Sequence, residues 1–393
     1  MSKLIQSLTD IFRPAKPISP GVYTYQTPET ASDQYRLHLR VNQTGDGLLI
    51  VNASTVLHLN QTATEYVYYL VQEISAQEAA KAISNRYQVN PQDARLDFLE
   101  IKQKITSLIE VPDLDPTIFF DFSRQDPYSG AVSAPYRLDC AITYNLPETS
   151  NPDLAPQRRV DRELSTEEWI SIIDKAWEAG IPQIIFTGGE ATTRGDLIEL
   201  LQHAENNGQV TGLLTDGHKL LDPVYLNQLL LSGLDHLMFV LTPLQKNSWT
   251  ALQKVLAEDL FTTVHLTIKK EILSQLPSIL KQIANFNPNA VSLSVSEPGN
   301  PSFEKALSAA QTQLAETGLP LKWDLPVPYS SHNPVKIELA ESENPPDGAG
   351  KAWLYLEPDG DVLPTQGVNQ IFGNFLTDSF EEIWQKALSN LNP

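Results

Sequence analysis

The central part of the sequence alternates between short, continuously apolar segments and longer segments whose apolar residues recur every three or four positions. The short segments predict strands and the longer ones amphipathic helices. The expected strands cover residues 137–143, 182–187, 210–215, 235–241, 261–268 and 290–295. The expected helices cover residues 165–179, 195–207, 222–232, 246–257, 272–286 and 302–317. This pattern indicates a parallel sheet covered by helices, as in a partial (β/α) barrel, a full eight-stranded barrel or an open doubly wound sheet.

A different pattern precedes this region, in residues 35–112. It begins with short segments of alternating apolar positions around a turn at Gly45-Asp46-Gly47. Residues typical of helix starts follow at Asn60, Ser75 and Pro91. The segment therefore predicts a small winged-helix-like module made of strands followed by helices.

The remaining segments flank these two regions. Residues 1–34 predict a helix and a Pro-rich tether; the helix packs on its own barrel or attaches to a partner or a membrane surface. Residues 113–135 form a Pro-rich linker, which leaves residues 136–325 for the barrel. Residues 326–393 predict a hairpin and a last helix.

Composition narrows the classes of function. The 393 residues suffice for two or three domains, and the net charge of −20 disfavours binding to nucleic acid. The sequence shows neither an apolar run long enough to cross a membrane nor a secretory signal, so the expected location is the cytoplasm. One cysteine, Cys140, excludes an intrachain disulfide and any all-cysteine metal site held by this chain alone.

Residues 163–217, "ELSTEEWISIIDKAWEAGIPQIIFTGGEATTRGDLIELLQHAENNGQVTGLLTDG", resemble the radical SAM superfamily. The resemblance implies an α/β fold with a TIM-like partial (β/α)6 barrel. It also implies a vestigial S-adenosylmethionine site, which would consist of Gly188, Gly189, Glu190, Thr215 and Asp216. In the family the glycines let the backbone approach the amino group of that ligand, and the carboxylate accepts a hydrogen bond from it. The alternative is an ordinary strand-to-helix turn with Glu190 near a helix N-terminus.

The same resemblance exposes a missing feature. Radical SAM enzymes hold a 4Fe-4S cluster through Cys-x3-Cys-x2-Cys in the loop after the first strand. In this chain Leu146, Ser150 and Asp153 take those three positions, and Cys140 lies too early, inside the strand. We therefore expect no iron-sulfur cluster, no other metal and no catalytic residue.

Two further segments resemble parts of peptide-modifying radical SAM proteins. Residues 354–384, "LYLEPDGDVLPTQGVNQIFGNFLTDSFEEIW", resemble the SPASM or twitch extension, but Thr365 replaces the cysteine of its Pro-Cys ligand to an auxiliary cluster. Residues 57–70, "LHLNQTATEYVYYL", and residues 78–89, "EAAKAISNRYQV", resemble the PqqD-like module. That module binds a leader peptide, so the second resemblance implies a peptide or protein partner.

Other polar residues offer weaker candidates. The seven histidines show no metal-ligand spacing; His218 and His265 could face the barrel mouth, but we expect both to be structural or solvated. Asp139, Glu190 and Asp216 could gather into an acidic cluster that binds a cation. Strand alternation allows only one of Asp139 and Cys140 to face the lumen.

The sequence thus leads to a hypothesis with two alternatives. The hypothesis is a radical-SAM-type scaffold or peptide-recognition partner that is not an enzyme and needs no cofactor, although it could still bind S-adenosylmethionine. The first alternative is an enzyme that binds S-adenosylmethionine or a nucleotide and performs polar, cluster-free chemistry at the barrel mouth. The second is a radical enzyme completed by cysteines of a partner chain.

Overall fold

The computed structural model describes residues 18–28, 30–31, 34–53, 55–110, 132–147, 153–322, 325–341 and 346–390. The chain divides into two compact units, Met1–Ser133 and Ala134–Pro393. The helix expected near residue 4 and the linker expected at 113–135 lie wholly or mostly outside the described residues.

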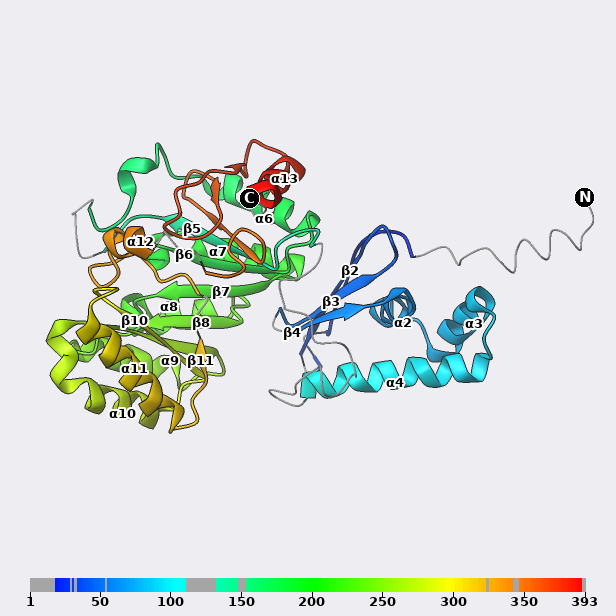
Figure 1. Cartoon of the computed structure of the whole chain (residues 1–393), viewed down its shortest axis with the longest axis horizontal. Coiled ribbons are helices and arrows are strands. Elements are labelled where there is room, and N and C mark those ends of the chain that lie inside the picture. Colours follow the sequence, from blue (N-terminus) through cyan, green and yellow to red (C-terminus); the bar gives the residue numbers. More distant parts are fainter. Residues whose placement is uncertain are drawn as a thin grey trace, which may run out of the picture. The chain divides into compact units, whose positions relative to one another are not determined.

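Among the residues that the structure describes, the first unit contains a four-stranded antiparallel sheet followed by three helices (Figure 1). The strands are β1 (Gly21–Gln26), β2 (Arg36–Val41), β3 (Gly47–Val51) and β4 (Thr55–Leu59), in that spatial order. The helices are α2 (Gln61–Val71), α3 (Ala76–Tyr87) and α4 (Pro91–Glu110). As expected, the Asn60 and Ser75 side chains cap α2 and α3 by accepting hydrogen bonds from backbone N–H groups.

Strand β1 changes the expected boundary of this unit. It lies in the segment that we expected to be a tether, yet it pairs with β2 from Gly21 opposite Val41 to Gln26 opposite Arg36. Its partly buried Tyr23 and Tyr25 alternate with exposed residues, which suits an edge strand that covers the core on one face. The small module therefore begins before residue 35.

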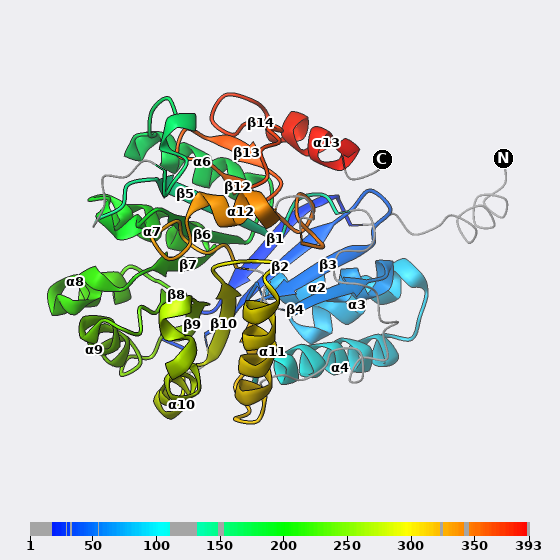
Figure 2. The ribbon, with the colours of Figure 1, turned by 60° about the vertical axis from the view of Figure 1, so that its left-hand side comes forward.

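The second unit is built on the predicted strand-helix alternation (Figures 1 and 2). Six parallel strands form its centre: β5 (Arg137–Thr143), β6 (Gln183–Gly188), β7 (Val210–Thr215), β8 (His236–Val240), β9 (Phe261–Ile268) and β10 (Ala290–Val295). The helices between and after them are α6 (Thr166–Glu178), α7 (Leu197–Asn207), α8 (Pro223–Leu230), α9 (Lys246–Val255), α10 (Leu276–Phe286) and α11 (Pro301–Ala315). The predicted fold class is confirmed.

Helix α6 illustrates how the sequence specifies these elements. Ser165 and Glu168 form a reciprocal capping box that begins the helix. Trp169, Ile172 and Ile173 are completely buried. Burial of each such side chain contributes about 1.5–3 kcal/mol, so the apolar stripe fixes which face of the helix covers the sheet.

The lumen of the barrel is closed by a segment from beyond its last helix. Ile185, Leu214 and Met238 lie on β6, β7 and β8 and form a buried cluster, against which Leu325 and Val327 pack. The segment that begins at Leu325 therefore lies across the strands and continues into α12 (Val335–Glu341). It brings residues from near position 330 to the carboxyl ends of the strands.

The C-terminal part extends the barrel sheet. Strand β12 (Trp353–Leu356) pairs in parallel with β5, and β13 (Asp361–Leu363) and β14 (Gly373–Asn374) continue the sheet antiparallel. On the other edge, the short β11 (Leu321–Lys322) pairs with β10. The last helix, α13 (Phe380–Asn390), follows the hairpin as expected.

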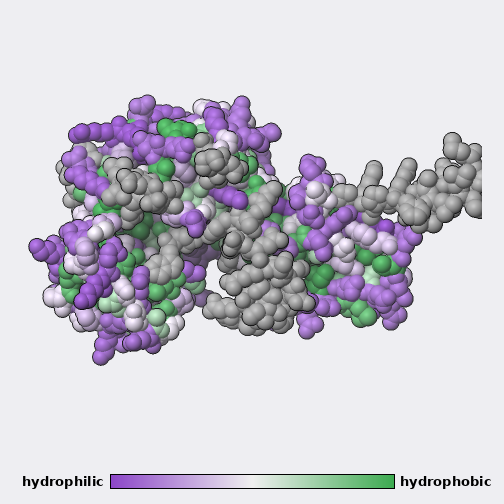
Figure 3. All heavy atoms as spheres, viewed as in Figure 1, coloured by the Kyte–Doolittle hydropathy of each residue, from purple (hydrophilic) through white to green (hydrophobic). Residues whose placement is uncertain are grey.

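The surface of the second unit is largely polar where it can be seen. Hydrophilic residues cover most of the described surface of the barrel unit on the face shown in Figure 3. No helix among the described residues is long and apolar enough to cross a membrane.

Candidate functional site

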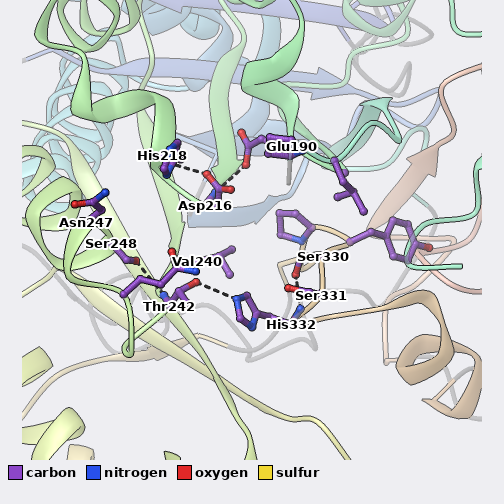
Figure 4. A pocket seen from close by; sticks show the side chains of 16 residues that line it. Glu190, Asp216, His218, Val240, Thr242, Asn247, Ser248, Ser330, Ser331 and His332 are labelled. Atoms are coloured by element: carbon purple, nitrogen blue, oxygen red, sulfur yellow. Dashed lines mark hydrogen bonds between the residues drawn. The ribbon is translucent and has the colours of Figure 1, made fainter. Parts of the chain in front are cut away.

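A pocket opens at the carboxyl ends of β6, β7 and β8, where (β/α) barrels place their sites (Figure 4). It encloses about 160 Å³. Its lining residues come from the loops after the strands and from the segment that crosses the lumen: Leu146, Pro147, Gly189, Glu190, Asp216, His218, Val240, Thr242, Gln245, Asn247, Ser248, Pro328, Tyr329, Ser330, Ser331 and His332.

Glu190 joins the ends of two strands. One carboxylate oxygen accepts hydrogen bonds from the Thr192 N–H (3.0 Å), the Thr192 hydroxyl (2.6 Å) and the Thr215 hydroxyl (2.7 Å). The other oxygen accepts one from the Asp216 N–H at 2.8 Å. Burial, followed by the nearby charge of Asp216, raises the pKa of Glu190 to about 7. Glu190 therefore orders the loops after β6 and β7 and also caps a short 3-10 turn, as the turn alternative predicts.

Asp216 stands at the pocket wall. Its Oδ1 accepts a hydrogen bond from the backbone N–H of His218 at 2.8 Å. The structure thus brings together Gly189, Glu190 and Asp216 at the pocket surface. The other two predicted residues, Gly188 and Thr215, are not among the lining residues; Thr215 supports Glu190 through its hydroxyl.

The two glycines are required by contacts within the chain. Gly188 has a φ of +130°, and a Cβ there would lie 2.0 Å from the Thr143 carbonyl oxygen. A Cβ at Gly189 would lie 2.4 Å from the Asn145 carbonyl oxygen. The Gly189 and Glu190 N–H groups donate to these same carbonyls at 2.8 and 2.9 Å. The segment after β5 therefore packs directly against the Gly-Gly backbone.

The expected acidic cluster has two members at the pocket instead of three. Asp139 lies within β5 and forms a buried ion pair with Arg137, with Nε–Oδ1 at 2.7 Å and Nη2–Oδ2 at 3.1 Å. The Arg137 guanidinium also lies 5.1 Å from the centre of the Trp353 ring. Among the described residues, no group of three His, Cys, Asp or Glu side chains could hold a metal ion.

The residues do not fit a cluster bound by three thiolates. Cys140 is fully buried in β5, and burial raises the pKa of its thiol well above the ordinary value. Leu146 and Pro147 line the pocket where the family has its first cysteine. Asp153 is exposed, and Ser150 lies outside the described residues. Because the sequence holds a single cysteine, this chain alone cannot supply three thiolates to such a cluster.

In the C-terminal extension, Thr365 stands where the related SPASM or twitch extension has the cysteine that binds its auxiliary cluster. The Thr365 hydroxyl accepts a hydrogen bond from the Trp353 indole N–H at 3.1 Å. A neutral polar contact therefore exists where the related extension carries a cysteine.

A network of buried tyrosines next to the pocket was not predicted from the sequence. The Tyr144 hydroxyl donates to Glu357 Oε1 at 2.8 Å, and Arg159 forms an ion pair with the same carboxylate. The Tyr144 ring meets the Tyr329 ring edge-on at 5.4 Å between centres. These residues come from positions between 144 and 357, so no local motif in the sequence could have revealed them. Of these residues Tyr329 lines the pocket, so the network holds part of its wall in place.

The wall opposite the carboxylates was also missed. His332 Nε2 lies 3.1 Å from the Thr242 hydroxyl oxygen, and its Nδ1 is in hydrogen-bond contact with Lys269 Nζ (Figure 4 shows the first of these bonds). The two histidines singled out from the sequence are placed differently. His218 is exposed at the pocket edge, whereas His265 is buried and contacts the hydroxyls of Ser292 and Ser294 at 2.9 and 3.0 Å.

The chain is similar to known proteins in sequence, although it matches no protein-family model. It is 24% identical over 287 residues to the PqqA peptide cyclase of Gluconobacter oxydans, covering 64% of this chain and 77% of that protein. It is 36% identical over 110 residues to the PqqA peptide cyclase of Granulibacter bethesdensis, covering 27% of this chain and 29% of that protein.

Solved structures show the same fold. SuiB of Streptococcus suis bound to its precursor peptide SuiA aligns with a TM-score of 0.58 at 13% identity, over 88% of this chain and 86% of SuiB. The structure of SuiB bound to S-adenosylmethionine aligns with a TM-score of 0.58 at 13% identity, over 92% of this chain and 88% of SuiB.

These comparisons correct two expectations. The expectation that the chain is not an enzyme is wrong, because the relatives are named peptide cyclases. The expectation that it needs no cofactor is also wrong, because the similar SuiB was solved with S-adenosylmethionine bound. The chain therefore has the radical SAM fold, and its resemblance to the peptide-modifying branch of that superfamily is confirmed.

Proposed function

We propose that this chain is a peptide-modifying enzyme that binds S-adenosylmethionine in the pocket at the ends of β6 to β8. The observation that carries the proposal is the placement of Glu190 and Asp216, two carboxylates from neighbouring strand ends, at one wall of that pocket. The name of the relatives and the ligand of SuiB support it. The vestigial site expected from the sequence becomes a working site in this proposal.

The charges of the pocket suit this ligand. S-adenosylmethionine carries an ammonium and a sulfonium, and both are stabilised beside carboxylates. The opposite wall offers neutral hydroxyl and amide groups from Thr242, Asn247 and Ser248 for its polar atoms. When bound, the ligand would supply an activated carbon–sulfur bond.

The chain's own residues prepare the pocket for a cation. Glu190 is fixed by four hydrogen bonds, so it needs no reorganisation when a ligand arrives. A cation beside Glu190 would favour its ionised form and lower its raised pKa. Asp216, held by the His218 N–H, would accept a hydrogen bond from the ligand's ammonium group.

The peptide would bind at the first unit. In the part of this unit that the structure describes, the antiparallel sheet has β1 and β4 at its edges, and an edge strand can pair with an extended peptide. The resemblance of residues 57–89 to the PqqD-like module, and the precursor peptide bound to SuiB, support this role.

The first experiment measures S-adenosylmethionine binding by calorimetry. Asp216→Asn keeps the size of the side chain but removes the charge beside the ligand's ammonium, so binding should weaken about tenfold or more. Asp259→Asn makes the same change at an exposed position after α9 and should leave the affinity unchanged. Equal affinities of the wild type and Asp216→Asn would refute the assignment of this wall.

A further inference from the structure

Three groups from different parts of the chain form a continuous contact at the pocket. Thr242 follows β8, Lys269 follows β9, and His332 belongs to the segment that crosses the lumen. Lys269 Nζ contacts His332 Nδ1, and His332 Nε2 lies 3.1 Å from Thr242 Oγ1. Thr242 and His332 line the pocket, and Lys269 continues the contact toward solvent.

The positions of the protons on Lys269, His332 and Thr242 follow from which of these groups can donate and which can accept a hydrogen bond. A lysine ammonium has no acceptor, so it donates to Nδ1; His332 then carries its proton on Nε2 and donates to Thr242. A neutral lysine amine can accept from Nδ1, which leaves Nε2 to accept the Thr242 hydroxyl proton. The protonation state of Lys269 therefore selects the tautomer of His332 and the direction of the Thr242 hydroxyl.

The surroundings of His332 keep its ring neutral in both of these proton arrangements. Burial, followed by the positive charge of Lys269, lowers the pKa of His332 to about 4. Burial also lowers the pKa of Lys269, and Glu271 partly opposes this. The other titratable groups lining the pocket are Glu190, Asp216 and His218, together with Tyr329, which lies on the same segment as His332.

We propose that Thr242, His332 and Lys269 form a proton relay between the pocket ligand and solvent. A proton leaves an N–H or O–H group of the ligand that faces Thr242 Oγ1, while the Thr242 proton moves to His332 Nε2. The Nδ1 proton of His332 moves to the neutral Lys269 amine, which becomes an ammonium. No bond other than those to hydrogen changes, and within the relay only Thr242 exchanges a proton with the ligand. The ligand part of this inference rests on the proposed function.

The tautomer of His332 tests the relay without any ligand. Nitrogen NMR of the full chain should show His332 changing from Nε2–H to Nδ1–H as the pH rises, with the same midpoint as the loss of the Lys269 proton. Lys269→Met should abolish this change of tautomer. Lys270→Met removes the neighbouring, exposed lysine and should leave it intact. A single tautomer throughout the titration, or an unaltered change in Lys269→Met, would overturn the relay.

A second measurement involves the ligand. The affinity for S-adenosylmethionine should depend on pH around the Lys269 midpoint, by up to tenfold per pH unit, in the wild type and Lys270→Met. Lys269→Met should bind without this dependence. A wild type that does not bind S-adenosylmethionine would refute the proposed function, whereas the NMR result would still decide the relay. An unchanged pH profile in Lys269→Met would count against the relay alone.

Discussion

At the scale of single residues, the pocket depends on backbone contacts that admit no side chain. The Gly189 N–H donates to the Thr143 carbonyl, and the backbone after β5 lies where a Cβ would stand. The motif Gly-Gly-Glu is therefore explained by the packing of the chain on itself, whatever ligand is bound. A role of these glycines in ligand approach stays a prediction.

Gly189→Ala should consequently destabilise the protein and distort the pocket. Its Cβ would lie 2.4 Å from the Asn145 carbonyl oxygen, and such overpacking costs about 1–3 kcal/mol. Gly195→Ala is the matched control, because nothing lies within 4 Å of its Cβ, and it should change stability by less than about 0.5 kcal/mol. Urea unfolding measures both; equal stabilities of the two variants would contradict this account.

The sequence predicted some residues of the pocket correctly and misplaced others, and the difference has a physical reason. Glu190 and Asp216 could be found because both follow strands directly, and the ends of parallel strands meet at one edge. Asp139 was misplaced in the acidic cluster because its partner, Arg137, lies two residues away on the same face of the strand. Strand position predicts the face of a side chain but not which neighbour neutralises it.

At the scale of elements, the C-terminal extension is fastened to the barrel by a lysine. Lys175 on α6 donates hydrogen bonds to the carbonyls of Phe375, Leu376 and Asp378 at 2.5, 3.2 and 3.0 Å. Its ammonium also lies 5.8 Å from the centre of the Phe375 ring. One side chain thus donates hydrogen bonds to three backbone carbonyls in the turn between β14 and α13.

Lys175→Met should loosen this turn. The variant leaves carbonyls without their charged donor, and a hydrogen bond to a charged group is worth about 1.5–3 kcal/mol, less where solvent reaches it. Amide hydrogen exchange should rise in residues 373–379, while Lys281→Met, a change at an exposed position on α10, should not alter it. Unchanged exchange in Lys175→Met would show that the extension is held by its apolar contacts alone.

The elements themselves were largely predictable. The six barrel strands follow the apolar runs, since a strand buried on both faces needs apolar residues throughout. Strand β1 was missed because a Pro-rich flank suggested a tether. Its pairing with β2 depends on a contact that no local pattern expresses.

At the scale of the whole molecule, the chain combines a unit that holds a barrel and its pocket with a unit whose described sheet has β1 and β4 at its edges. Each unit has its own buried core, so each can contribute its own binding step. The proposed division is ligand binding in the barrel and peptide capture in the first unit.

Peptide capture should appear as local protection from hydrogen exchange. The probe is the PqqA peptide of Gluconobacter oxydans, because a relative of this chain is named PqqA peptide cyclase. This peptide should protect amides of β1 or β4 in the full chain. A scrambled peptide of the same composition is the control. Protection confined to the second unit, or the same protection with both peptides, would reject this role of the module.

The sequence by itself determined the alternation of strands and helices, the strand-end carboxylates and the supply of a single thiol, because these depend on local pattern and on composition. Only the tertiary structure decided the pairing of Arg137 with Asp139, the tyrosine network, and the meeting of Thr242 with His332. The tyrosine contacts and the meeting of Thr242 with His332 join segments that are far apart in the sequence, so they follow from how whole elements pack. Arg137 and Asp139 are only two residues apart in β5, and it is their shared burial that makes them partners.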